Sequence, residues 1–296
     1  MYECKSDMKV ANSCICCQSD GIHKTQAILA PFVANRVFGW SPVEITSEWG
    51  FRDIPNGLAQ TTCATIACAD CGAIFLDMRF DDEELASLYS DYRGEQYTIL
   101  REQYEPGYSN RNKTLLEKPA YIPVVEKLLS RHLNPNPVVL DWGGDTGLNT
   151  PFAAIAARHD VYDISGKETI GRARRVDYAS IGRDYDLIVC SQVLEHVADP
   201  LLLMRQIAAC MSETTVLYAE IPYESLMQKI ANGESVASDK RHWHEHVNFF
   251  TPESLQAMAT LIDLDVIEIG SIPLVVGQVE SSGLYLIASK PCRSSK

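Results

Sequence analysis

From residue 137 onward, short apolar runs alternate with stretches whose apolar positions recur at helical spacing. The apolar runs predict buried strands, because a strand that is covered on both faces is apolar along its whole length. Alternating strands and helices are typical of an α/β fold, in which helices cover both faces of a mostly parallel, doubly wound sheet. The predicted strands are 137–142, 160–165, 185–192, 214–222, 264–271 and 282–290, and the predicted helices include 199–211 and 251–263.

The turn after the first predicted strand has the residues expected of a ligand-binding loop. It reads "GGDTG" at 143–147, and we expect a helix that starts at Pro151 with Asn149 or Thr150 as its N-cap. Glycines let the backbone turn tightly and approach a ligand closely. The second predicted strand ends at Asp163, whose carboxylate can accept both hydroxyls of a ribose. Because ligands bind at the carboxyl ends of such strands, these residues predict a nucleoside site.

A polar, tyrosine-rich connector occupies residues 81–118. Its acidic start suits a helix N-terminus. Tyr97, Arg101 and Tyr104 share one face of a helix, because they are spaced i, i+4 and i+7. Two interpretations stay open: this face packs on the next domain, or the segment is a lid that binds a polar, partly planar ligand.

Seven of the ten cysteines lie in the first 71 residues. Cys14 with Cys17, and Cys68 with Cys71, form two C-x-x-C pairs of zinc-knuckle form, because each tight turn points two thiolates at one ion. Four thiolates leave no open coordination position, so we predict a structural zinc. Buried free cysteines are the alternative interpretation. The residues that could replace one of these ligands are Cys16, Cys63 and His23.

Charge and hydropathy argue against a nucleic-acid-binding, membrane-spanning or secreted protein. The net charge of −13 disfavours nucleic acid as a partner. No run of 18 apolar residues predicts a membrane span, and the N-terminus has no apolar core followed by a cleavage site. We therefore expect a soluble cytoplasmic protein. In a reducing cytosol, ten cysteines favour a metal site over disulfides.

Three of the seven histidines, His242, His244 and His246, fall within "RHWHEHVNFF" at 241–250. If the chain is extended there, their spacing of two places them on one face. They could bind a metal ion, or one could act as a general base with Glu245 as its orienting carboxylate. They could also satisfy buried backbone groups, which is a purely structural role. All three interpretations remain open.

Three phrases together resemble a known enzyme family. "VVLDWGGDTG", "VYDIS" and "YDLIVCSQVLEHVADP" are similar to the motif series of class I S-adenosylmethionine-dependent methyltransferases. The "VLEHV" phrase is the most specific, because a dehydrogenase has no reason to carry it. The resemblance covers about residues 116 to 296. The cysteine knuckles, the connector and "HWHEHVNFFTPESL" further resemble a subgroup with an N-terminal zinc module, which includes sugar C-methyltransferases.

The resemblance implies a seven-stranded Rossmann-like methyltransferase sheet and three parts: a zinc-binding module (1–80), a connector or lid (81–118) and a methyltransferase domain (119–296). It implies S-adenosylmethionine as cofactor, with Asp163 on the ribose, Asp177 on the adenine and Asp145 at the methionine end. Two departures are evident. Asp145 replaces a family glycine, and the connector lacks the serine-rich stretch of C-methylating relatives, so O-methylation stays open. The implied cofactor residues are Asp141, Gly143, Gly144, Asp145, Gly147, Asp163, Asp177, Ser191 and Gln192.

The acceptor site implied by the resemblance lies around the histidines. His244, Glu245 and His246 match residues that act at the substrate in the sugar C-methyltransferases, and His196 of "VLEHV" approaches from the other side. The expected acceptor is a small polar molecule such as a sugar, a nucleotide-sugar or a natural-product intermediate. The alternatives are a non-catalytic zinc-ribbon interaction protein and a protein methyltransferase. The predicted substrate-binding residues are Tyr97, Arg101, Tyr104 and Arg241.

Overall fold

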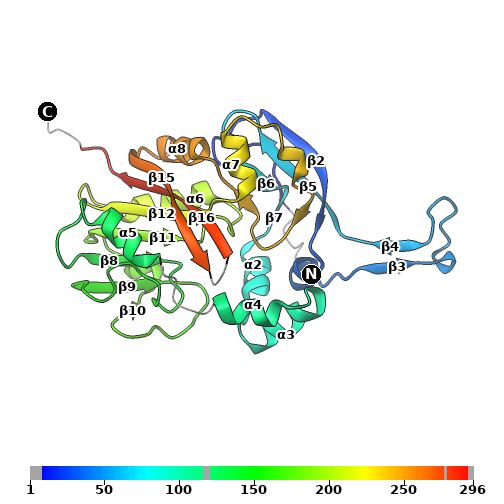
Figure 1. Cartoon of the computed structure of the whole chain (residues 1–296), viewed down its shortest axis with the longest axis horizontal. Helices are drawn as coiled ribbons and strands as arrows, with labels where there is room; N and C mark the ends of the chain where they lie inside the picture. Colours follow the sequence, from blue (N-terminus) through cyan, green and yellow to red (C-terminus); the bar gives the residue numbers. More distant parts are fainter. Residues whose placement is uncertain (1–8, 116–120, 277–278, 293–296) are drawn as a thin grey trace, which may run out of the picture.

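The computed structural model describes residues 9–115, 121–276 and 279–292. A seven-stranded sheet forms the larger half, in the order β10-β9-β8-β11-β12-β16-β15 (Figure 1). All neighbouring strands are parallel except β16, which is antiparallel to β12 and β15. The predicted Rossmann-like α/β fold is confirmed. The strands are β8 (Val138–Trp142), β9 (Arg158–Tyr162), β10 (Arg174–Arg175), β11 (Leu187–Ser191), β12 (Val216–Pro222), β15 (Asp265–Val276) and β16 (Val279–Ser289).

Helices cover both faces of this sheet, because successive strand residues point to opposite sides. Val139 and Leu187 belong to the core cluster under α5, whereas the adjacent Leu140 and Ile188 belong to the cluster under α6 and α8. Among the described residues, no helix is long and apolar enough to cross a membrane. The covering helices are α5 (Ile122–Leu129), α6 (Pro200–Cys210) and α8 (Pro252–Leu261).

The helix that we expected from Pro151 does not form, and that prediction is wrong. Residues 151–155 make hydrogen-bonded turns. Phe152 has a φ of 63°, a left-handed value that interrupts a right-handed helix. Only residues 143–157 connect β8 to β9, and the glycine turn takes the first of them. The N-cap and proline signals are local, and the remaining connection is too short for them to start a helix.

A second, five-stranded sheet joins the N-terminal region to a distant part of the chain. Its order is β13-β2-β5-β6-β14. The outer strands β13 and β14 both come from residues 241–250, which we call the histidine segment. This segment therefore forms both edges of the N-terminal sheet. β13 pairs in parallel with β2, and β14 pairs antiparallel with β6. The strands are β2 (Ile22–Leu29), β5 (Thr62–Cys68), β6 (Ile74–Leu76), β13 (His242–Trp243) and β14 (Asn248–Phe249).

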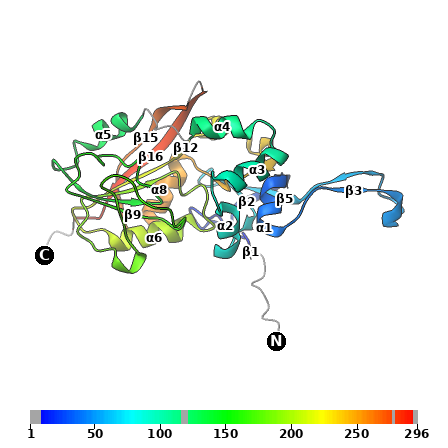
Figure 2. The same ribbon diagram turned by 90° about the horizontal axis from the view of Figure 1, so that it is seen from below.

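A hairpin arm extends from the N-terminal sheet, away from the rest of the molecule (Figures 1 and 2). It contains β3, η1 and β4, and it exposes about half of the surface of Trp49 and Phe51, whose rings stack. Another short pair, β1 with β7, flanks the sheet. These elements are β1 (Lys9–Val10), α1 (Pro31–Phe38), β3 (Val43–Ile45), η1 (Ser47–Trp49), β4 (Gly57–Ala59) and β7 (Met78–Arg79).

Three short helices form the connector between the two sheets (Figure 1). The acidic start predicted near residue 81 is a capping box, in which Asp81 and Glu84 each accept the backbone N–H of the other, at 2.9 and 2.8 Å. The connector helices are α2 (Asp82–Tyr89), α3 (Glu95–Tyr104) and α4 (Tyr108–Leu115), and the remaining helical elements are η2 (Tyr178–Ser180), α7 (Ser225–Ala231) and η3 (Ala237–Asp239).

One buried arginine fastens the N-terminal sheet to the turn after β11. The Arg79 guanidinium donates to the carbonyl oxygens of Val197 and Ala198 and to Asn248 Oδ1, at 2.7–3.0 Å. The Asn248 amide in turn donates to the carbonyl oxygens of Leu194 and Val197, at 2.8 and 2.7 Å. The turn at 194–198 is therefore held by side chains from β7 and β14.

Replacing Arg79 by methionine should destabilise the protein strongly. The change leaves the Ala198 carbonyl and Asn248 Oδ1 without their buried donor and removes one of the two donors of the Val197 carbonyl, and each group left unpaired costs roughly 1–3 kcal/mol. We expect the free energy of unfolding in urea to fall by about 3 kcal/mol or more. The matched control is Arg183→Met, because Arg183 is exposed and such a change is worth about 0.5 kcal/mol or less. Equal losses in the two variants would contradict the fastening role.

Candidate functional site

A single cavity of about 2150 Å³ lies between the carboxyl edge of the large sheet, the connector helices and the N-terminal sheet. Sites for one small molecule usually measure about 300–1,000 Å³, so this cavity has room for two ligands. One end is lined by residues after β8, β9 and β11, and the other end is lined by the connector and the histidine segment. We describe the two ends in turn.

The turn after β8 needs glycine at two positions. Gly143 has a φ of +82°, and a Cβ there would lie 2.4 Å from Val193. Gly147 has a φ of +78°, and a Cβ there would lie 2.9 Å from Ala173. Asp145 also adopts a positive φ, 51°, and its carboxylate pairs with Lys167 at 3.0 Å. The aspartate at the family's glycine position is thus accommodated by a left-handed backbone and a lysine partner.

Asp163 lies at the end of β9, on the wall of the cavity. Its Oδ2 accepts the backbone N–H of Asp145 and its Oδ1 accepts that of Ser165, at 2.8 and 2.7 Å, which fixes the carboxylate in place. The next residue, Ile164, also lines the cavity and is 74% exposed. An apolar side chain beside a fixed carboxylate fits the base and the ribose of a nucleoside. Ile164 was missed in the sequence because one apolar residue after an acid is a weak signal.

Asp141 and Gln192 line the same end of the cavity. Asp141 is buried and accepts the Thr150 hydroxyl at 2.5 Å, and burial raises the pKa of its carboxyl to about 7. Gln192 has a left-handed backbone, φ 58°. The buried carboxylate of Glu220 accepts the Gln192 side-chain amide at 2.9 Å, and the Glu220 carbonyl accepts its backbone N–H at 2.7 Å. Gln192 and the adjacent Ser191 are therefore held at the cavity wall.

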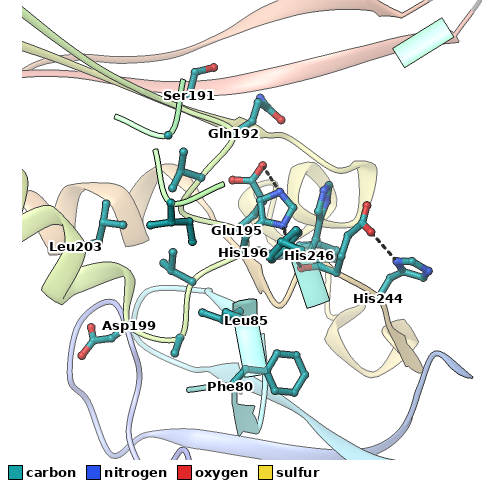
Figure 3. Close-up of a pocket in the computed structure, with 18 of the residues that line it drawn as sticks. Phe80, Leu85, Ser191, Gln192, Glu195, His196, Asp199, Leu203, His244 and His246 are labelled. Carbon is teal, nitrogen blue, oxygen red and sulfur yellow. Dashed lines mark hydrogen bonds and ion pairs between the residues drawn. The ribbon is translucent and has the colours of Figure 1, made fainter. Parts of the chain in front are cut away.

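The three clustered histidines do not share one face. β13 ends at Trp243 and β14 begins at Asn248, so the backbone between them leaves the extended conformation. His242 lies at the exposed edge, whereas His244 turns toward α3 and His246 turns toward His196 (Figure 3). The condition for placing the three histidines on one face, an extended chain through this segment, is not met. All three line the cavity, and the two that are partly buried, His244 and His246, have different environments.

His244 is held between carboxylates. Its Nε2 bonds to Glu105, and its Nδ1 lies 3.6 Å from a Glu245 oxygen. Burial lowers the pKa of His244, but the hydrogen bonds to Glu105 and Glu245 outweigh it and leave the pKa above its ordinary value. Arg101 Nη2 approaches the same ring at 3.3 Å. Both ring nitrogens are thus engaged by the protein, which makes His244 a poor proton acceptor.

Glu245 is the centre of an ion-pair network and not a free substrate ligand. Arg101 donates to its Oε2 at 2.6 Å and the Tyr97 hydroxyl donates to the same oxygen at 2.9 Å. Tyr97 is fully buried, and the Tyr104 hydroxyl bonds to Ser41 at 3.0 Å. Of the three residues predicted to form one ligand-binding face, only Arg101 lines the cavity. Tyr97 and Arg101 together position Glu245.

Glu195, His196 and His246 meet at the centre of the cavity wall (Figure 3). His196 Nδ1 lies 2.6 Å from the Tyr89 hydroxyl, and its Nε2 lies 3.7 Å from Glu195 Oε1. The His196 and His246 rings meet edge to face, with centroids 4.7 Å apart. Burial, followed by the proximity of His196, lowers the pKa of His246 to about 3, and burial also lowers the pKa of His196. Both imidazoles are therefore neutral at pH 7.

Glu195 was not among the sequence candidates, although it belongs to the "VLEHV" phrase. Its side chain is 2% exposed, and burial raises the pKa of its carboxyl to about 8. Besides Tyr97, Tyr104 and Gly147, two more predicted site residues lie outside the cavity lining. Asp177 and Arg241 are exposed, and neither lines the cavity. Asp177 caps η2, outside the end of β10, and Arg241 precedes β13, where its carbonyl accepts the backbone N–H of Ile28.

The four knuckle cysteines come together as predicted. The sulfur atoms of Cys14 and Cys71 are 3.5 Å apart, as are those of Cys17 and Cys68, and all four lie within 4.8 Å of one another. Cys16 is also buried, but its sulfur is outside this group, and its backbone N–H donates to Cys14 Sγ at 3.4 Å. Four converging thiols are the donor set of a closed, four-coordinate metal site.

Comparison with solved structures finds low sequence identity. The chain is similar to 1,6-didemethyltoxoflavin-N1-methyltransferase of Burkholderia thailandensis, solved with 1,6-didemethyltoxoflavin and S-adenosylhomocysteine, with 15% identity and a TM-score of 0.48 over 75% of this chain and 96% of that chain. It is also similar to magnesium protoporphyrin IX methyltransferase of Synechocystis PCC 6803 with bound S-adenosylhomocysteine, with 14% identity and a TM-score of 0.43 over 66% and 99% of the two chains. No curated protein matches the chain.

A match to a protein-family model shows which family the chain belongs to. The family described as "Methyltransferase domain" matches residues 115–269, which are 155 of the 296 residues. This span contains the large sheet from β8 to the first part of β15 and the residues after β8, β9 and β11 that line one end of the cavity. The chain belongs to the family described as "Methyltransferase domain" and is a methyltransferase.

Proposed function

We propose that this enzyme methylates a small polar acceptor, of the class of a sugar, a nucleotide-sugar or a natural-product intermediate. The observation that carries the proposal is the single cavity that joins the carboxyl edge of the sheet to the histidine segment. One ligand at each end brings a methyl donor and an acceptor face to face, and positioning of this kind supplies much of the rate enhancement of a displacement. The mixed arginine, tyrosine and carboxylate lining of the acceptor end suits a polar ligand with several hydroxyls.

The cofactor end fits S-adenosylmethionine, which supplies an activated methyl group on a sulfonium. Asp163 would hold the ribose hydroxyls, because its carboxylate is fixed by two backbone donors, and Ile164 would pack against the adenine. Asp145 and Gln192 face the methionine end. The fit rests on an exposed apolar side chain beside a fixed carboxylate, next to a turn whose glycines keep the cavity wall free of side chains.

At the acceptor end, we assign proton removal to the neutral histidine pair, His196 and His246. An acceptor hydroxyl, amine or carbon acid must lose a proton as the methyl group is transferred, and a general base must be unprotonated to take it. His244 does not meet this condition, because Glu105 and Glu245 occupy its nitrogens. We give His244 and Glu245 the role of holding the histidine segment in place. The acceptor atom, oxygen or carbon, does not follow from this arrangement.

We also propose a structural zinc on Cys14, Cys17, Cys68 and Cys71, and a location in the cytoplasm. All nine cysteines in the described part of the chain are free, which fits a reducing compartment. The zinc would connect the start of the chain to the turn between β5 and β6. The alternative of a non-catalytic interaction protein depended on Asp145, whose partners Lys167 and Asp163 now account for it.

The first prediction concerns cofactor binding. Calorimetric titration with S-adenosylhomocysteine should show binding by the wild type, and Asp163→Ala should weaken it by about 30-fold or more. The reason is the loss of hydrogen bonds to a carboxylate, each worth about 1.5–3 kcal/mol. The matched control is Asp177→Ala, which should bind like the wild type because Asp177 lies outside the cavity. A folded wild type that does not bind would contradict the proposed function.

A second prediction separates the histidines. In a screen of nucleotide-sugars that follows release of S-adenosylhomocysteine, His246→Gln should lower kcat by about 100-fold or more, the usual size of a general-base effect. Its affinity for S-adenosylhomocysteine should stay within about twofold of the wild type. His132→Gln, which changes a histidine outside the cavity, should retain full activity. An unchanged kcat in His246→Gln would refute the assignment of proton removal to this pair.

The third prediction concerns zinc. The purified protein should contain one zinc per chain by elemental analysis, and Cys71→Ser should lose it. Because the binding free energy of a structural zinc is also folding free energy, this variant should unfold at a clearly lower temperature. Cys63→Ser is the control, since Cys63 lies outside the group of four sulfur atoms, and it should keep its zinc. Full zinc occupancy in Cys71→Ser would exclude the four-cysteine site.

A further inference from the structure

The carboxylate of Glu195 has no place in the mechanism described so far. Both of its oxygens are buried, and neither has a hydrogen-bond partner among the described residues. A proton on the carboxyl group removes its charge but leaves both oxygens unsatisfied, and an unpaired buried polar group costs roughly 1–3 kcal/mol. Because Glu195 lines the cavity, its missing partner can be a ligand that enters from there.

The neighbours of Glu195 supply two nitrogen donors. One ligand atom each from Glu195, His196 and His246 lies within 4.8 Å of the others. Around a cation with bonds of about 2.1 Å, ligand atoms at right angles lie about 3 Å apart, so the three side chains need to approach by roughly 1–2 Å. Two neutral imidazoles and one carboxylate with open positions are the donor set of many divalent iron and related metal sites.

The surroundings of the three residues are also those of a metal site. Metal-binding histidines usually engage their second ring nitrogen with a neighbouring group, which fixes the direction of the first. His196 Nδ1 lies 2.6 Å from the Tyr89 hydroxyl, and Nε2 therefore points toward Glu195. The backbone of Glu195 is fixed too, because its carbonyl accepts the N–H groups of Val247 and Asn248 at 2.7 and 3.1 Å. That pair of bonds joins the turn that carries Glu195 to the segment that carries His246.

We propose that Glu195, His196 and His246 bind one divalent first-row transition-metal cation in the acceptor part of the cavity. The cation pairs with the orphaned carboxylate, and its open positions face the space where the acceptor binds. An acceptor with neighbouring oxygen atoms can complete the coordination, which selects substrates that carry a vicinal diol or a hydroxy-carbonyl group. The site is separate from the four cysteines, which select zinc through sulfur.

This inference rests on the proposed function, because it places the cation where the acceptor is proposed to bind. It also makes proton removal dependent on metal occupancy. In the metal-free protein the lone pairs of His196 and His246 are available to a proton, whereas in the loaded protein they hold the cation. An acceptor hydroxyl group on the cation would then lose its proton more readily, because coordination stabilises the oxyanion, and the proton would pass to water in the open cavity instead of to an imidazole.

The test uses Mn²⁺, whose paramagnetic resonance signal is strong in water and weakens on binding. The full-length, zinc-loaded wild type should bind one Mn²⁺ per chain. Glu195→Gln and His246→Ala should weaken that binding by about 30-fold or more, and Tyr89→Phe, which keeps all three ligands, by about tenfold. The matched control is Glu213→Gln, which removes an exposed carboxylate outside the cavity and should bind Mn²⁺ like the wild type.

Each sample should also be titrated with S-adenosylhomocysteine, which reports on folding and on the proposed function independently of Mn²⁺. A wild type that binds S-adenosylhomocysteine but not Mn²⁺ overturns the metal site and leaves the methyltransferase proposal standing. Equal Mn²⁺ affinity in Glu195→Gln and the wild type also overturns it. If Glu195→Gln fails to fold, Tyr89→Phe decides, and an affinity for Mn²⁺ equal to that of the wild type then counts against the site.

Discussion

The structure depends on one buried charge, the guanidinium of Arg79. It lies between the two sheets and donates to the carbonyls of Val197 and Ala198 and to Asn248. A charge in this position is tolerable only when its donors are satisfied, so the turn after β11 and the strand β14 must stay where these acceptors are. This requirement sets the position of Glu195 and His196 relative to His246, because the first two lie in that turn and the third lies next to β14. The arrangement of Glu195, His196 and His246 is thus a consequence of how the two sheets are joined.

The sequence predicted those parts of the fold that depend on local pattern. The strands β8, β11 and β12 are mostly apolar because both faces of the sheet are covered. The two cysteines of each knuckle lie close together because a tight turn joins them. The helix from Pro151 was predicted from equally good local signals, and it failed because the connection between β8 and β9 is short and Phe152 takes a left-handed backbone. A constraint of that kind belongs to the tertiary structure, and no cap or proline encodes it.

The sequence predicted many of the residues that line the candidate site, but not which of these residues contact one another. The residues near β8, β9 and β11 line the cavity because the carboxyl ends of parallel strands meet at one edge. Tyr97 and Arg101 were correctly placed on one helical face, but their partner Glu245 lies more than 140 positions away in the chain. Glu195 was not predicted as a site residue, because its surroundings also come from distant parts of the chain. Its importance comes from the partners that it lacks, and a missing partner is visible only when the surrounding residues have been placed.

The histidine segment is the edge of the N-terminal sheet on both sides, through β13 and β14. The N-terminal region is therefore not an independent domain, although the sequence suggests one, because its sheet includes two strands from residues 241–250. A recombination event that exchanged only residues 1–80 between two related enzymes would place a foreign sheet beside native edge strands, with mismatched side chains at β2 and β6. Any viable exchange has to carry the segment near 240–250 as well. The cysteine-rich region and the residues near 240–250 are thus expected to change together in evolution, although they lie in two separate stretches of the gene.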